Sequence, residues 1–269
     1  MLLLDHPLAL FVITFFLLWL ASWAGMALTF RRHELPESVR EDYGTIIGAT
    51  LTLLGLLIGF TFSMATTRYD LRKQLEEEEA NSIGTEYARL DFLPAADAGQ
   101  LQGLLRQYTD LRIRFYTTRN QAELRRLNAD TAKMQNQMWA LVSQAAQLQS
   151  SPLTALASSG MNDVLNAQGY TQAAWWNRIP IAAWCLMFLI AVLSNLLLGY
   201  GMHRRAVVLS IILPLAVSLS FFLIADIDSP RGSVIRIHPQ NLNALVDSLQ
   251  TGSSTPNRVP NEPGAGEDH

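Results

Sequence analysis

Long apolar runs alternate with polar stretches along this chain. Three runs exceed the roughly 20 residues that a helix needs to cross about 30 Å of hydrocarbon: Leu8–Phe30, Gly44–Thr67 and Ile179–Tyr200. A fourth run, Ala206–Ala225, just reaches this length. We therefore expect a multi-pass protein of a cell membrane. An even number of crossings places both termini on the same side.

The second run gathers its small and hydroxyl residues on one side of the predicted helix, with one aromatic residue among them: Gly44, Thr45, Gly48, Thr52, Gly55, Gly59, Phe62 and Ser63. At about 100° per residue, the four glycines fall within an arc of about 60°. Large aliphatic residues occupy the opposite half of the helix. One side of the helix thus suits contact with lipid, and the other suits contact with a neighbouring helix or with a water-filled path.

Two interpretations of the glycine side remain open. In the first, the glycines allow another helix to pack closely against this one. In the second, the side lines an ion path, where Thr45, Thr52 and Ser63 offer hydroxyl groups to a dehydrating anion and Phe62 forms an apolar constriction. Both interpretations can hold at different heights of one helix.

The segment between the second and third crossings, Arg68–Arg178, is rich in Ala, Leu, Gln, Glu and Arg, which favours helix throughout. No proline interrupts the chain from Thr45 to Leu93, so we expect the second crossing to continue as one helix of about 50 residues, or about 75 Å. Leu93-Pro94 ends this helix.

Further helices are predicted over 96–118 and 121–149. Another opens at Ser151-Pro152, as an N-cap followed by proline at the first helical position, with breaks near Gly160 and Gly169. Beyond the fourth crossing we expect a short strand over 234–238, a short helix over 239–249 and a disordered tail.

These patterns give an all-α fold in which four transmembrane helices carry a long helical extramembrane segment. The expected parts are a first transmembrane hairpin over 1–66, the helical segment over 67–178, a second hairpin over 179–226, a juxtamembrane segment over 227–250 and the tail over 251–269.

Composition narrows the function further. The mean hydropathy of +0.16 and the 16% of charged residues fit a chain that is part bilayer and part water-exposed. The net charge of −3 and the scattered arginines argue against nucleic-acid binding. The five histidines lie far apart, and no nucleotide loop or nucleophile motif is present, so we predict no enzyme activity, no cofactor and no metal site.

The stretch Gly59–Arg72 (GFTFSMATTRYDLR), followed by Glu79–Leu90 (EANSIGTEYARL) and Leu93-Pro94, resembles the bestrophin-like family of prokaryotic membrane proteins. That family is itself a domain of unknown function. The resemblance covers most of residues 1–250, including the four crossings, the helical segment after the second crossing, and Asp226–Gly232 after the fourth.

The resemblance implies a homo-oligomer related to the bestrophins, which are pentameric anion channels lined by their second crossing. Bestrophins also bind calcium through an acidic cluster after the fourth crossing. Here only Asp226 and Asp228 stand in that place, so calcium gating is not implied.

The family pattern also favours a set of polar residues that form either a network between helices or an ion site: Tyr69, Asp70, Arg72, Glu79, Asn81 and Arg89. By contrast, Glu76–Glu78 is typical of a solvated helix face.

The side of the membrane stays open. Basic residues in the connections 31–43 and 202–205 favour a cytoplasmic position for these loops, with the helical segment outside. Arg68, Arg72 and Lys73 lie close to the membrane on the other side, so the two sides differ little in basic residues. The family resemblance implies a cytosolic helical segment.

We therefore predict an oligomeric membrane protein that conducts chloride or another small anion along its second crossing. The alternative is a non-conducting scaffold or sensor whose helical segment binds a protein partner.

Overall fold

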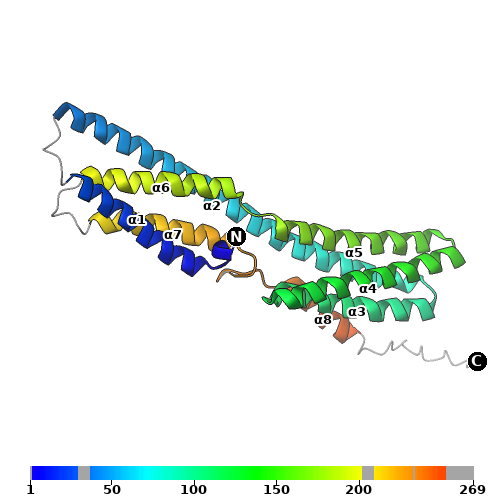
Figure 1. The fold of residues 1–269 in the computed structure, drawn as a ribbon. Helices are drawn as coiled ribbons and strands as arrows, with labels where there is room; N and C mark the ends of the chain where they lie inside the picture. The colour runs from blue at the N-terminus through cyan, green and yellow to red at the C-terminus, as the bar shows by residue number, and fades with distance from the viewer. Residues whose placement is uncertain (1, 30–36, 202–208, 233, 253–269) are drawn as a thin grey trace, which may run out of the picture. The chain divides into compact units, whose positions relative to one another are not determined.

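The computed structural model describes residues 2–29, 37–201, 209–232 and 234–252 (Figure 1). Helices follow one another in the order η1 (Leu2–Asp5), α1 (Pro7–Thr29), α2 (Glu37–Arg89), η2 (Leu90–Phe92), α3 (Ala95–Thr117), α4 (Gln121–Leu148), α5 (Pro152–Trp176), α6 (Ile181–Gly201), α7 (Leu209–Asp228) and α8 (Gln240–Gly252). The described ranges contain no strand, which confirms the all-α prediction.

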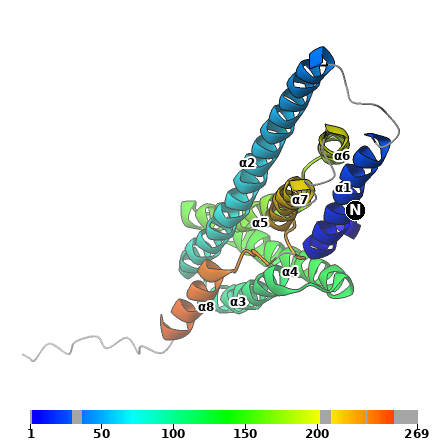
Figure 2. The ribbon, with the colours of Figure 1, turned by 90° about the vertical axis from the view of Figure 1, so that its left-hand side faces the viewer.

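The helix α2 is the continuous helix that the sequence predicts. It has 53 residues, and Figure 2 shows it as one uninterrupted coil. The short 3-10 helix η2 follows α2 directly, and helical structure ends at Leu93, whose ψ of 161° is extended. A proline at the next position disfavours the helical conformation of Leu93, which explains the stop.

The helix α5 differs from its prediction. Ser151 caps its start, because the Ser151 Oγ accepts the Thr154 backbone N–H at 3.1 Å. However, α5 continues through Gly160 and Gly169 without a break. A glycine inside a helix costs only about 1 kcal/mol, which tertiary packing readily offsets.

The strand predicted over 234–238 does not form, whereas the helix predicted after it is α8. A lone strand has no neighbour to pair with. Instead, the Asp226 carboxylate accepts the backbone N–H groups of Val234 and Ile235, at 2.7 and 2.9 Å. The predicted disordered tail lies outside the described residues from 253 onward.

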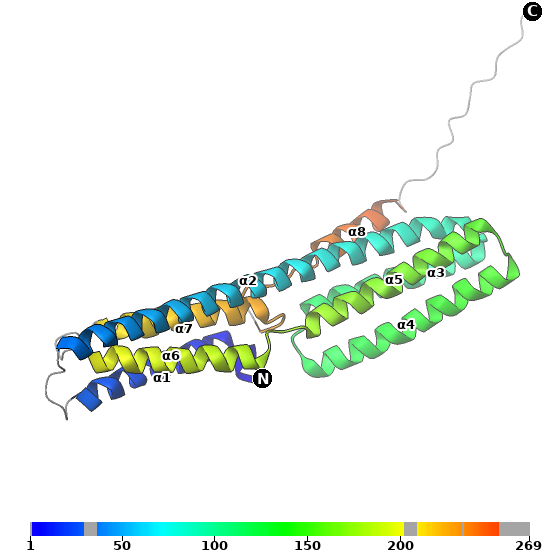
Figure 3. The same cartoon turned by 90° about the horizontal axis from the view of Figure 1, so that it is seen from above.

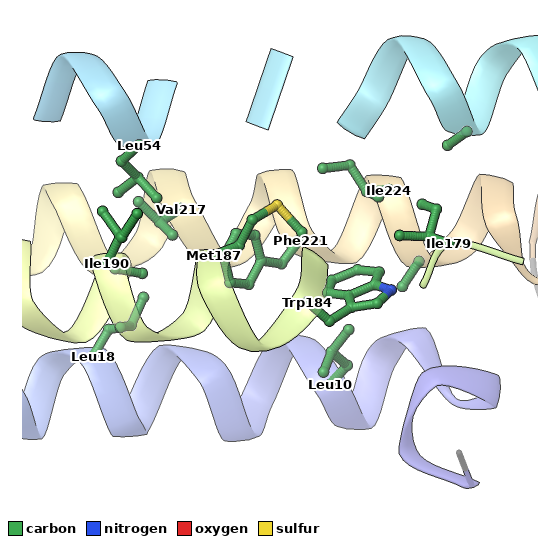
Figure 4. Close-up of a cluster of buried hydrophobic side chains, with 13 residues drawn as sticks. Leu10, Leu18, Leu54, Ile179, Trp184, Met187, Ile190, Val217, Phe221 and Ile224 are labelled. Atoms are coloured by element: carbon green, nitrogen blue, oxygen red, sulfur yellow. The ribbon is translucent and has the colours of Figure 1, made fainter. Parts of the chain in front are cut away.

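The chain forms two compact units. Unit 1 holds residues 1–75, 118–124 and 166–238. In it, α1 packs against α6 and α7 around a core of large apolar side chains (Figure 4): Leu10, Leu18, Leu54, Trp184, Met187, Ile190, Val217 and Phe221.

The contact between α1 and α6 is close because glycines face backbone atoms. A Cβ at Gly199 would overlap the Ser22 carbonyl oxygen, and a Cβ at Gly25 would overlap the Leu196 carbonyl oxygen. Such close approach of backbones is typical of helix pairs in membranes.

Four helical stretches are long and apolar enough to cross a membrane, and they include α1, the first part of α2, α6 and α7. The four predicted crossings are therefore present as helices. Apolar runs of this length indicate a membrane protein.

Unit 2 holds residues 76–117, 125–165 and 239–269, of which those up to 252 are described. It consists of the second part of α2 with α3, α4, most of α5, and α8 (Figure 3). Its buried apolar side chains come from all five helices and include Ile83, Leu101, Leu105, Tyr108, Phe115, Leu127, Met138, Val142, Ala157, Met161, Val164 and Leu242.

Candidate ion path and buried polar clusters

The small-residue side of α2 is open within the single chain. All eight residues predicted to line a path or pack closely are exposed: Gly44, Thr45, Gly48, Thr52, Gly55, Gly59, Phe62 and Ser63. Among the residues that the structure describes, no atom lies within 4 Å of a Cβ added at any of the four glycines. The described helices of this chain therefore do not pack closely against these glycines.

A different stripe of α2 contacts the rest of unit 1. Leu54, Thr61 and Ala65 are its buried members between Gly44 and Thr67. Leu54 points toward Val217 of α7 (Figure 4). Only 11% of the most apolar window of α2 is buried, compared with 33–44% for the other candidate spans. Most of the apolar surface of α2 is thus left for lipid, solvent or another subunit.

The hydroxyl groups on the open side differ in their bonding. Thr52 Oγ1 donates to the Gly48 carbonyl oxygen at 2.8 Å, so in this rotamer it turns lone pairs rather than its proton outward. The exposed Ser63 hydroxyl makes no hydrogen bond to another residue in the described part of the chain. Phe62 is 39% exposed beside it.

Arg72 forms the centre of a buried polar cluster in unit 1. Its Nε donates to the Ala174 carbonyl oxygen at 3.2 Å, and its Nη2 donates to the carbonyl oxygens of Asn177 and Asp228 at 3.1 and 3.2 Å. These acceptors lie at the ends of α5 and α7, where carbonyl groups lack helical partners. Arg72 thereby ties three helices together.

Asp228 completes this cluster. Its carboxylate accepts the Ile179 backbone N–H at 3.3 Å and lies 3.9 Å from Arg68 Nη1. Since Asp226 accepts the two backbone N–H groups of residues 234 and 235, both acids after the fourth crossing serve the local fold.

Glu79 forms a second buried cluster, in unit 2. Its Oε1 pairs with Arg112 Nε of α3, and its Oε2 accepts the Tyr116 hydroxyl at 3.1 Å. Burial disfavours the charged form of Arg112, but the adjacent Glu79 carboxylate outweighs burial, and the pKa of Arg112 is raised. This cluster fastens α3 to α2.

The other predicted polar residues lie elsewhere. Arg89 pairs with Asp163 of α5 at 3.7 Å. Asp70 and Asn81 are exposed, and Tyr69 is half-buried. The structure thus places Arg72 and Glu79 in separate clusters and brings none of Tyr69, Asp70 and Asn81 into either cluster.

The prediction of a solvated face is wrong for Glu76, although Glu77 and Glu78 are exposed. The buried Glu76 carboxylate accepts the Leu242 backbone N–H at 3.0 Å and the Asn241 amide at 2.6 Å. It therefore caps the start of α8, where unpaired N–H groups and the helix dipole favour a negative charge.

One signal in the sequence indicates which acids of α2 are buried, although the prediction of a solvated face missed it. Along the second part of α2 and into η2, buried positions recur at spacings of four and three residues: Arg72, Glu76, Glu79, Ile83, Glu86 and Leu90. This is the spacing of the inner face of a packed helix, so charged residues in register with Ile83 and Leu90 are candidates for burial.

The described residues contain no group of three or more His, Cys, Asp or Glu side chains that could hold a metal ion. The candidate site is the small-residue side of the first part of α2, in unit 1.

Several solved structures are similar to this chain in fold. A variant of a bacterial bestrophin homolog from Klebsiella pneumoniae is 14% identical, with 91% of this chain and 99% of that chain covered and a TM-score of 0.66. A second variant is 16% identical, with coverages of 91% and 95% and a TM-score of 0.66. The structure of the homolog phased with zinc is 15% identical, with coverages of 91% and 99% and a TM-score of 0.64. At these identities the likeness shows the fold.

Sequence comparison identifies the family of the chain but no individual curated relative. No curated protein sequence matches the chain. The family model of the Bestrophin-like domain matches residues 15–242, which include most of the first candidate crossing, the apolar parts of the other three and both polar clusters. The chain therefore belongs to the bestrophin-like family.

Proposed function

We propose that the protein is an oligomeric channel for chloride or another small anion, in which copies of α2 surround a central path. The observation that carries this proposal is the open side of α2, whose four glycines have no close neighbour in the described part of their own chain. In this arrangement, the face from Gly44 to Ser63 lies toward the axis, and α1, α6 and α7 form the outer wall of each subunit.

Charge on the path is compatible with anions. The residues from Gly44 to Thr67 include no charged side chain, and the next residue, Arg68, is basic. An uncharged lining does not repel anions, and hydroxyl groups can replace part of their hydration. The preference for anions over cations rests on membership of the family.

Efflux of chloride from liposomes that contain the purified oligomer tests the proposal. Thr52→Leu, Gly48→Leu and Gly55→Leu each place a bulky side chain on the open side, so they should abolish chloride efflux while oligomer size is unchanged. Leu53→Ala is the matched control, since Leu53 is exposed on the other side of α2. Potassium efflux measured in parallel tests the selectivity.

Loss of the oligomer in the glycine variants would show that this side packs helices rather than lining a path. Absence of flux in the wild type, across varied pH, calcium and voltage, would overturn the channel. It would favour a scaffold or sensor whose helical segment binds a protein partner.

A further inference from the structure

Glu86 is a buried acid without a hydrogen-bond partner. It lies on the inner face of α2 in unit 2, and its side chain is 0% exposed. Neither of its carboxyl oxygens has a hydrogen-bond partner in the part of the chain that the structure describes. An ionised carboxylate would lose its hydration here without compensation, so this environment favours the protonated, neutral form.

Gly160 of α5 provides the space for this carboxyl. A Cβ at residue 160 would overlap Glu86 Oε2 and would lie 2.7 Å from Arg89 Nη1. The side chains of Glu86 and Arg89 therefore converge on the α5 backbone at this glycine. The contact also explains why a glycine stands at this position, since a larger residue would push α5 away from α2.

Arg89 lies beside Glu86 but is paired with another acid. Its Nη1 is 3.7 Å from Asp163 Oδ2, and the Asp163 side chain is 57% exposed. These two groups are the charged neighbours that act on Glu86. Burial raises the pKa of Glu86 to about 8, which Arg89 opposes and Asp163 reinforces.

This region lies outside the hydrocarbon. The apolar part of α2 ends at Thr67, and 24 apolar residues already span about 36 Å as a helix. The helix that follows contains Glu76 and Glu79 and packs in the polar unit 2. Protons of the aqueous phase therefore set the protonation of Glu86.

We propose that Glu86 is a proton-binding switch in unit 2: the neutral carboxyl lets α5 rest against α2 at Gly160 and leaves Arg89 to Asp163, whereas the ionised carboxylate takes Arg89 as its partner and loosens this contact. The step is loss of one proton from the Glu86 carboxyl to water, with no other bond made or broken. Asp163 is exposed enough to be hydrated when Arg89 leaves it.

The direction of the pH effect follows from linkage. The folded state holds the Glu86 proton up to a pH of about 8, while an unfolded glutamate releases it near its ordinary value of 4.5. Because the folded state binds more protons between these values, the contribution of Glu86 to stability falls as pH rises through this window and levels off above it.

Infrared spectroscopy of the full-length protein in nanodiscs tests the proposal. The wild type should show a protonated carboxyl band at pH 7 that disappears with a midpoint near pH 8. Glu86→Gln should remove this band, whereas Glu78→Gln, at an exposed glutamate, should leave it unchanged. A wild-type spectrum at pH 7 without a band that depends on Glu86 would overturn the proposal.

Two further variants test the partners and do not alter Glu86 itself. Arg89→Gln removes a charge that lowers the pKa of Glu86 and should move the midpoint upward. Asp163→Asn removes a charge that raises the pKa and should move the midpoint downward. We expect shifts of about 0.5–1 pH unit, a three- to tenfold change in proton affinity. Midpoints that do not move, or that move in the same direction, would contradict the switch.

Discussion

The Arg72 guanidinium donates a hydrogen bond of 3.2 Å to the Asp228 carbonyl oxygen and so joins the second helix to the end of the last membrane helix. Two further donations, to Ala174 and Asn177, bring the end of α5 to the same side chain. A planar guanidinium with fixed donors suits several carbonyl acceptors at once.

Arg72→Lys should therefore destabilise unit 1 although it keeps the charge. A lysine ammonium has fewer donors in a different geometry, and losing hydrogen bonds from a buried charged group should cost about 2–3 kcal/mol. Thermal unfolding in detergent measures the loss. Lys73→Arg, at the exposed neighbouring position, is the control and should leave the unfolding temperature unchanged. Equal stability of the two variants would contradict the role of Arg72.

Glu79→Ala should loosen α3 from α2 by about 3–5 kcal/mol, because it leaves the buried charge of Arg112 without a counter-ion. Hydrogen exchange of the α3 amides reports this local opening. Glu77→Ala removes an exposed carboxylate two residues away and should not change the exchange. If α3 exchanges at the wild-type rate in Glu79→Ala, the ion pair does not hold this helix.

Glu76→Ala should free the start of α8, since Leu242 and Asn241 lose their shared acceptor. Loss of a helix cap costs about 1–2 kcal/mol, so exchange in Gln240–Gly252 should become faster. Proteolysis after α8 provides a second readout. The same Glu77→Ala variant is the control here, and a protected α8 in Glu76→Ala would argue against this cap.

Gly199→Ala should weaken the pair of helices α1 and α6. Its methyl group would overlap the Ser22 carbonyl oxygen, and the resulting backbone shift should cost about 1–3 kcal/mol. Gly103→Ala in α3 is a matched control because a Cβ there meets nothing within 4 Å. The control should be neutral or gain up to about 1 kcal/mol from helix propensity. A Gly199→Ala protein as stable as the control would show that the helices can move apart freely.

Local signals in the sequence predicted the helices well. Apolar runs marked the four membrane helices, the absence of proline before Leu93 predicted the continuous α2, and Ser151-Pro152 marked the start of α5. Each signal acts on neighbouring residues, and hydrophobic length, proline sterics and capping need no distant partner. The expected breaks at Gly160 and Gly169 were wrong, because one glycine costs a helix only about 1 kcal/mol, and at residue 160 the close contact with α2 side chains favours glycine.

The candidate site was only partly accessible from the sequence. Periodicity placed the glycines of α2 on one side, and within the described residues a Cβ added at any of these four glycines meets no atom within 4 Å. We predict that neighbouring subunits surround this side, and the oligomer size and chloride efflux of the glycine variants test this prediction.

The class of protein, the positions of the helices and the set of α2 residues that share a face follow from the sequence, because these depend on hydrophobic length and helical period. The partners of the buried charged residues follow only from the three-dimensional arrangement. Glu79 meets Arg112 across 33 positions, Glu76 meets Leu242 across 166, and Arg72 meets Asp228 across 156. For these three side chains a distant segment supplies the partner that offsets the cost of burial, and the helical spacing within α2 indicates the buried face but not the partner.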